Sequence, residues 1–175
     1  TSEHSAPAEQ IASTPAHPII AAGQKQPTDT PPASSLMGYL QVGELVLTFH
    51  TIPERGEVGF ESWLDGGIEF TGNAGVWAPL SGDPDLGLVY LPVESATGDR
   101  YGGDRPGDNL FSDSIVAVDI KTGERQWHYQ LTHHDVWDWD IPGASVLADL
   151  PNGNRVLMSV TKQSWVYTFD RETGE

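Results

Sequence analysis

Residues 132–140, with the sequence THHDVWDWD, hold the densest group of chemically active side chains in the chain. On an extended backbone side chains alternate, so Asp138 and Asp140 share one face of the segment and the two tryptophans share the other. Two carboxylates on one face can bind a hard cation or accept a proton from a hydroxyl group. A turn whose aspartates accept hydrogen bonds from backbone amides explains the same residues, and the spacing leaves both interpretations open.

Two isolated residues are further candidates for function. Trp77 stands among small residues in the segment 72–79, GNAGVWAP. Glycine beside an aromatic ring lets a flat ligand approach it, although a tryptophan beside glycine is more often part of a core. Lys162 follows a predicted strand, where an isolated lysine usually faces solvent. The chain has neither a glycine-rich phosphate-binding pattern nor a G-x-S-x-G motif, so neither a nucleotide cofactor nor a serine nucleophile is supported.

The composition excludes several classes of function. The 175 residues contain 9 Lys and Arg against 25 Asp and Glu, and the formal net charge of −16 opposes binding to nucleic acid. The chain has no cysteine, which excludes disulfides, thiolate catalysis and cysteine-ligated zinc. No run reaches the ~18 apolar residues that a membrane-spanning helix needs.

The chain divides into two parts. Residues 1–35 are rich in Ala, Pro, Ser, Thr and Gln and offer little to bury, so we expect a flexible segment. In residues 36–175, short apolar runs alternate with turn residues, and the frequent glycines and prolines leave no room for long helices. This pattern predicts an all-β domain with strands at 45–49, 86–93, 115–120, 126–129, 156–160 and 165–169.

Two of these predicted strands belong to a repeated motif. Residues 116–124 read VAVDIKTGE and residues 167–175 read YTFDRETGE, 51 positions apart. In each copy an aspartate can accept hydrogen bonds from its own turn and a glycine can adopt a positive φ, which predicts a tight hairpin. A weaker copy stands at 38–44. A repeat near fifty residues is typical of β-propeller blades, so we expect about three blades and a chain that is a fragment of a larger propeller.

Five motifs in order carry a resemblance to a known family. They are TFHTIP at 48–53, GNAGVWAP at 72–79, LGLVYLPV at 86–93, YGGDRPGDNLF at 101–111 and HHDVWDWD at 133–140. The chain is similar to the pyrroloquinoline quinone (PQQ)-dependent dehydrogenases, most of all to the membrane-bound glucose dehydrogenase branch. The resemblance implies an eight-bladed β-propeller with PQQ and calcium or magnesium as cofactors. It also implies oxidation of a sugar or alcohol hydroxyl, with electrons passed to ubiquinone or another acceptor.

The resemblance implies roles for four residues. Asp140 falls at the position of the base that removes the substrate proton, and Trp77 at the position of the indole that stacks on the quinone. Lys162 falls where a cation contacts the quinone oxygens, and Asp138 where some relatives use a carboxylate to hold the metal ion. Ser95, 18 residues after Trp77, stands where many relatives carry an asparagine as a metal ligand. A hydroxyl is a weaker ligand than an amide carbonyl.

The expected function is therefore that of a PQQ-dependent oxidoreductase acting on an aldose such as glucose, or on an alcohol or polyol. The alternative is a non-catalytic propeller segment used for protein contacts, or an inactive truncated copy. A scaffold has no need for Trp77, Asp140 and Lys162 together, which favours the enzyme. Relatives work in the periplasm, often held at the inner membrane by helices that this chain does not contain. We expect the isolated chain to lack a complete cofactor site.

Overall fold

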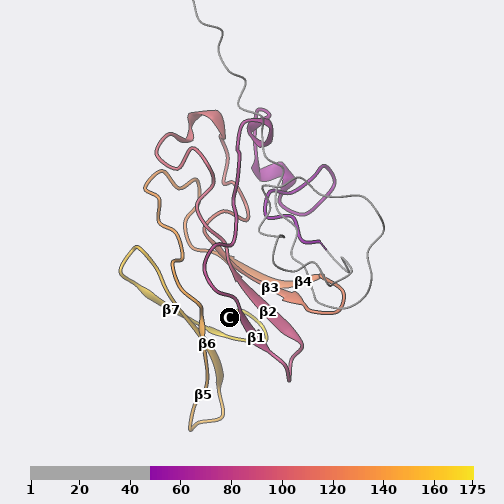
Figure 1. Ribbon diagram of the computed structural model, residues 1–175, viewed down its shortest axis with the longest axis vertical. Coiled ribbons are helices and arrows are strands. Elements are labelled where there is room, and N and C mark those ends of the chain that lie inside the picture. Colours follow the sequence, from indigo (N-terminus) through magenta and orange to yellow (C-terminus); the bar gives the residue numbers. More distant parts are fainter. Residues whose placement is uncertain (1–47) are drawn as a thin grey trace, which may run out of the picture.

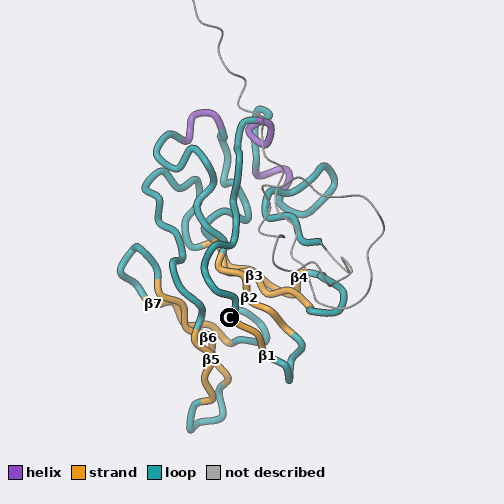
Figure 2. Tube along the Cα trace, viewed as in Figure 1, coloured by secondary structure: helices purple, strands orange, loops and turns teal. Residues whose placement is uncertain are grey.

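The computed structural model describes residues 48–175, which form two antiparallel sheets (Figure 1). The first sheet is a meander of β1 (Ser81–Asp83), β2 (Leu88–Pro92), β3 (Ser114–Asp119) and β4 (Arg125–Gln130). The second contains β5 (Val146–Asp149), β6 (Arg155–Val160) and β7 (Val166–Asp170). Helical structure in this part of the chain is limited to the short turns η2 (Phe60–Ser62), η3 (Gly67–Glu69) and η4 (Gly102–Asp104) (Figure 2). The all-β prediction is confirmed, whereas the predicted flexible segment 1–35 lies outside the described residues.

Most of the predicted strands are present, and the two observed strands that were not predicted are short and partly polar. The predicted runs at 86–93, 115–120, 126–129, 156–160 and 165–169 correspond to β2, β3, β4, β6 and β7. The sequence does not predict β1 or β5, because three or four partly polar residues show no clear period and are extended only through their pairing with β2 and β6. The strand expected at 45–49 is wrong in its described part, since residues 48 and 49 are not in a strand. No helix among residues 48–175 has the length and hydrophobicity to cross a membrane.

The repeated Asp-x-x-Thr-Gly-Glu motif forms the same turn after β3 and after β7, as predicted. Asp119 Oδ1 accepts hydrogen bonds from the backbone N–H groups of Lys121 and Thr122 at 2.8 and 2.9 Å. Asp170 Oδ1 accepts the two equivalent bonds, both at 2.9 Å. The glycine of each copy has a positive φ, 73° in the first and 80° in the second. Backbone hydrogen bonds of this kind hold the pKa of both carboxyl groups below the usual range.

Trp127 on β4 joins the two sheets. Its indole packs against Tyr90 and Phe169, with ring centroids 5.8 and 5.9 Å away. Its Nε1 donates a hydrogen bond to the Arg171 carbonyl at 3.2 Å. The ring also lies on Gly174, where an added Cβ would stand 2.7 Å from the indole, so only glycine allows this approach. Trp127 of the first sheet therefore packs against the repeated turn of the second sheet. The two sheets pack together as successive blades.

A buried ion pair between the sheets predicts a measurable loss of stability. Arg171 Nε lies 2.7 Å from Asp83 Oδ2, and both side chains are buried. Within residues 48–175, Asp83→Ala leaves Arg171 with the exposed Asp149 as its one ion-pair partner and also removes the contact of Asp83 with Arg155 at 3.1 Å. Breaking a buried pair from one side costs about 3 kcal/mol. We expect a loss of that size in the free energy of unfolding, measured by urea denaturation. Asp85→Ala is the control, because that carboxylate is exposed and 3.9 Å from Arg155. Equal losses in the two variants would contradict the prediction.

Candidate active site

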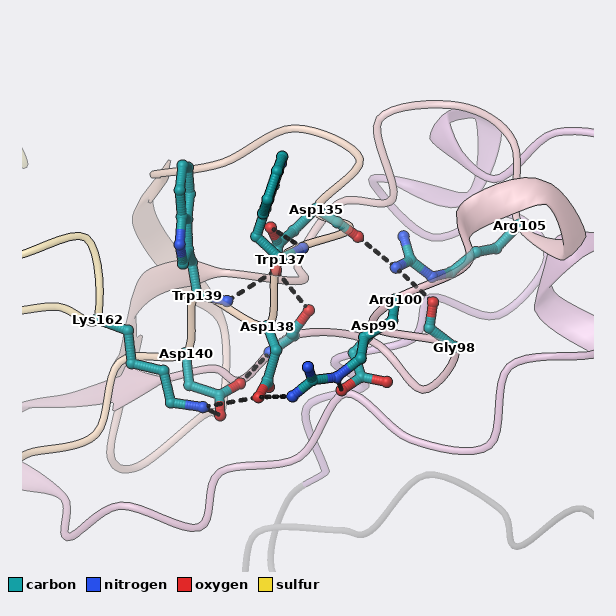
Figure 3. Close-up of polar contacts among 11 residues, drawn as sticks. Gly98, Asp99, Arg100, Arg105, Asp135, Trp137, Asp138, Trp139, Asp140 and Lys162 are labelled. Carbon is teal, nitrogen blue, oxygen red and sulfur yellow. Dashed lines mark hydrogen bonds and ion pairs between the residues drawn. The ribbon is translucent and has the colours of Figure 1, made fainter.

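The long connections of the fold gather at one end of the strands. Successive antiparallel strands run in opposite directions, so the connections β2–β3, β4–β5 and β6–β7 leave from the same end. The first holds residues 93–113, the second holds residues 131–145, and the third is the short turn that carries Lys162. Figure 3 shows the polar contacts that these connections make with one another.

Lys162 lies between two of the predicted site carboxylates. Its Nζ is 2.7 Å from Asp140 Oδ2 and 3.1 Å from Asp138 Oδ2. The hydrogen bond to Asp140 raises the pKa of Lys162 above its usual value, partial burial opposes this rise, and the bond to Asp138 adds to it. Arg100 approaches Asp138 Oδ2 at 3.5 Å from the exposed side. The structure therefore brings together three of the four residues that the sequence singles out.

The two tryptophans of the 132–140 segment lie on the side opposite the carboxylates, as the alternation predicts (Figure 3). Their indoles stack with ring centroids 6.0 Å apart and an interplanar angle of 20°. The backbone between them is not fully extended, because Asp138 has a φ of 63° in the left-handed region. The side-chain pattern is correct although the local backbone differs from a regular strand.

Asp135 accepts hydrogen bonds from backbone amides, and the sequence pattern does not show which aspartate of the segment does so. It is buried, and its carboxylate accepts hydrogen bonds from the backbone N–H groups of Trp137 and Trp139 and from the Ser95 hydroxyl. The two interpretations of the segment therefore apply to different residues. Asp135 binds backbone amides within a turn, whereas the later two aspartates face Lys162.

Trp77 is open to solvent in the described part of the chain. Its side chain is 55% exposed and is not part of the core that residues 48–175 form. The segment before it pairs with the residues after β2, where Glu94 N donates to Gly75 O at 2.9 Å. An accessible indole face is what stacking on a flat ligand requires.

Glu94 connects the Trp77 segment to the carboxylates and was not predicted. Its Oε1 accepts hydrogen bonds from the Gly75 backbone N–H at 2.8 Å and from the Asn73 side-chain amide. Burial raises the pKa of Glu94, the bond from Gly75 opposes the rise, and the charges of Asp140 and Asp138 add to it. Glu94 therefore lies within electrostatic range of the Lys162 cluster, and no pattern in the sequence marks it.

Asp113 is a buried carboxyl group close to the same cluster. Its Oδ2 accepts a hydrogen bond from the Ser112 hydroxyl at 2.7 Å, while its Oδ1 has no partner among the described residues. Burial raises the pKa of Asp113 to about 7, with the hydrogen bond from Ser112 opposing this and the charges of Asp135 and Asp140 adding to it. Asp113 is therefore expected to titrate near neutral pH.

This titration predicts a pH dependence of stability. The pKa of Asp113 is raised in the folded state, so its protonation stabilises the fold fully below about pH 4, and this contribution is lost as pH rises through about 7. Asp113→Asn should remove it. The difference in unfolding free energy, wild type minus variant, should fall as pH rises from about 5 to about 8 in urea titrations. Asp119→Asn, at a partly exposed carboxylate with a lowered pKa, should show no such fall. A flat difference for Asp113→Asn would refute the assignment.

The described residues fit PQQ better than they fit a divalent cation. Trp77 offers an open indole face, and the Lys162 ammonium can face carbonyl oxygens of a quinone. Among residues 48–175, however, no three His, Asp or Glu side chains converge as a metal site. The Ser95 hydroxyl donates its hydrogen bond to Asp135 at 2.8 Å. This part of the chain does not form a cation site by itself.

Successive antiparallel sheets with a polar site on the connections at one end define the protein as a β-propeller segment with a candidate active site. The family model described as "PQQ: Glucose/ethanol/alcohol dehydrogenase, beta-propeller domain" matches residues 14–175. The chain therefore belongs to the family of PQQ-dependent dehydrogenases. The resemblance inferred from its motifs is confirmed, and similar proteins include quinoprotein glucose dehydrogenases.

Individual relatives support the same family. A quinohemoprotein alcohol dehydrogenase, ADH-IIG, of Pseudomonas putida is 34% identical over 150 residues, which cover 77% of this chain and 21% of that protein. The quinoprotein glucose dehydrogenase of Escherichia coli K12 is 41% identical over 103 residues, 57% of this chain and 13% of that protein. The solved structure of a europium-containing methanol dehydrogenase has a TM-score of 0.68 and 26% identity, covering 78% of this chain and 27% of that one. The chain thus spans only a minor part of each relative.

Proposed function

We propose that this chain forms part of the catalytic centre of a PQQ-dependent dehydrogenase that oxidises a hydroxyl of an aldose such as glucose, or of an alcohol or polyol. The observation that carries the proposal is the Lys162 ammonium group between the carboxylates of Asp138 and Asp140, at 3.1 and 2.7 Å. Relatives named as glucose, glycerol and alcohol dehydrogenases support the same substrate class.

The residues of this chain would bind the cofactor and take the substrate proton. Bound PQQ would accept the two electrons that leave the substrate carbon. Trp77 would stack on the plane of the cofactor, and Lys162 would lie near its oxygens. Asp140 would take the proton of the substrate hydroxyl, with the negative charge of its carboxylate compensated by the adjacent ammonium group.

Two carboxylates are candidates for the base. The family resemblance assigns Asp140, whose oxygens are fixed by the Ser95 N–H at 2.8 Å and by Lys162 at 2.7 Å. The side chain of Asp138 is more exposed, 26% against 11%, and its Oδ1 accepts no hydrogen bond from residues 48–175. Because the family resemblance assigns Asp140, it is the proposed base, and Asp138, with its freer oxygen, is the second candidate. The assignment of Asp138 to a calcium or magnesium ion stays a prediction.

The remaining parts of the proposal rest on the family alone. Transfer of electrons to ubiquinone or another quinone acceptor and a periplasmic location at the inner membrane are properties that the resemblance implies. They concern the whole protein. The region that this chain matches covers only about a fifth or less of each curated relative.

A non-catalytic propeller segment is the second candidate function. The observation that favours it is at Ser95, the position where the family resemblance implies an asparagine ligand. Its hydroxyl is directed to Asp135 instead, and no metal-binding group of three ligands forms within residues 48–175. A copy that had lost its cation site would still keep the strands and turns of the propeller.

The test uses the full-length gene product that carries this chain, supplied with PQQ and calcium. Glucose, glycerol and ethanol are offered in turn, and reduction of an artificial electron acceptor is followed by absorbance. We expect PQQ-dependent oxidation of at least one of the three, and none in the protein without PQQ. Binding of PQQ without oxidation of any aldose, polyol or alcohol would contradict the enzyme and support the non-catalytic segment.

A further inference from the structure

We propose that Asp135 is the positioning residue of this site, which fixes the backbone that presents Asp138 and, through Ser95, the carboxylate of Asp140. The inference deepens the proposed function and rests on it for its effect on catalysis. Asp135 is buried. Within residues 48–175 it makes no hydrogen bond to Lys162, and its carboxylate accepts hydrogen bonds only from its own loop and from Ser95.

The first effect of Asp135 is on the backbone at Asp138. Asp135 Oδ1 accepts the Trp137 N–H at 3.0 Å, and Oδ2 accepts the Trp139 N–H at 2.9 Å. These amides lie on either side of Asp138, whose φ is 63°. This left-handed conformation is uncommon for residues with a Cβ, although aspartate adopts it more readily than most. The two hydrogen bonds hold the backbone on both sides of Asp138, and its side chain points to Lys162 (Figure 3).

The second effect of Asp135 is on the carboxylate of Asp140. The Ser95 hydroxyl donates to Asp135 Oδ2 at 2.8 Å, while the backbone N–H of Ser95 donates to Asp140 Oδ1 at 2.8 Å. Asp135 therefore holds the side chain of the residue whose amide holds Asp140. Asp135 therefore supports both carboxylates that contact Lys162, Asp138 through the loop backbone and Asp140 through Ser95.

Arg105 fixes the position of Asp135 itself. This buried guanidinium donates Nη2 to the Asp135 backbone carbonyl and, at 3.1 Å, to the Gly98 carbonyl. Its Nη1 donates to Asn109 Oδ1 at 2.7 Å. A planar guanidinium with donors committed to three partners has few other positions. The loop of Asp135 is thus tied to the connection after β2, which gives the site the rigid support that a reactive geometry needs.

Asp135→Asn tests the proposal in the full-length, PQQ-loaded protein. Asparagine replaces one acceptor oxygen by an NH₂ group that faces N–H donors, so at least one of the loop hydrogen bonds is lost. We expect kcat to fall about 100-fold, as a displacement near 1 Å at a reacting centre does, while KM and the Kd for PQQ change less than about threefold. Ser95→Ala removes only the link toward Asp140 and should lower kcat about tenfold or less.

The matched control is Asp119→Asn. That carboxylate also accepts two backbone N–H groups, but it does so in the exposed turn between β3 and β4. Its kcat and KM should equal those of the wild type. Hydrogen exchange followed by mass spectrometry supplies a readout that does not depend on activity. In Asp135→Asn, exchange should become faster at residues 135–140 and stay unchanged in β2, β3, β4 and β6.

Each outcome of these measurements has a definite meaning. A fall in kcat with KM, PQQ binding and the strand amides preserved supports positioning. A kcat within twofold of the wild type, or unchanged exchange at residues 135–140, would overturn it. A parallel loss of kcat, PQQ affinity and strand protection would also overturn it, since that pattern marks a general folding role. If the wild type oxidises no substrate, the proposed function fails, and the local exchange rates alone then decide whether Asp135 holds the loop.

Discussion

Replacing Asp140 with asparagine is expected to lower kcat of the full-length, PQQ-loaded protein about 1,000-fold, with KM changed less than about threefold. Asparagine keeps the shape of the side chain and an oxygen for the Ser95 N–H, which donates at 2.8 Å, but it cannot take up the substrate proton. Initial rates with glucose or an alcohol and an artificial acceptor, measured over a range of substrate concentrations, check the size of the loss in kcat and the small change in KM.

Asp138→Asn is the matched variant for this prediction. Lys162 keeps one carboxylate partner in either variant, at 3.1 Å from Asp138 or 2.7 Å from Asp140, so the loss of one ion pair is common to both. A smaller loss of kcat in Asp138→Asn than in Asp140→Asn supports Asp140 as the base. A larger loss in Asp138→Asn would transfer the role to Asp138.

The second large effect is expected on PQQ binding. Trp77→Ala should weaken the affinity of the apoprotein for PQQ about 50- to 100-fold, because removal of an aromatic anchor from a binding site typically costs ~2–3 kcal/mol. Trp77 is 55% exposed, so its loss removes a ligand contact without opening a cavity in the described core. Titration with PQQ, followed by tryptophan fluorescence and by quinone absorbance, measures the change in Kd.

Two variants give this second prediction its controls. Trp165→Ala removes an indole that is 67% exposed and has no assigned contact with PQQ, and it should leave the Kd within about twofold of the wild type. Trp77→Phe keeps an aromatic face and should retain part of the affinity. Equal losses of affinity in Trp77→Ala and Trp165→Ala would show that the exposed indoles act on stability or solubility instead of on the cofactor.

Local sequence was sufficient for the two repeated turns of this fold. The turns at Asp119 and Asp170 are built from hydrogen bonds to amides two and three residues further on, so the motif contains all of its own partners. The apolar runs of β2, β3, β6 and β7 are likewise visible because alternating or continuous burial leaves a pattern in the sequence. β1 and β5 are too short for such a pattern, and their pairing partners define them.

The sequence by itself determined the family, the blade repeat and the types of residue at positions 77, 138, 140 and 162. Only the tertiary structure decided which groups meet. Ser95 reaches Asp140 across 45 positions, and Lys162 reaches the same carboxylate across 22. The tertiary structure also distinguishes the three aspartates of residues 132–140. Asp135 accepts hydrogen bonds from backbone amides, whereas the other two face Lys162. The physical reason is that spacing records contacts within a turn or strand, whereas contacts between distant loops arise only when the sheets fix where those loops lie.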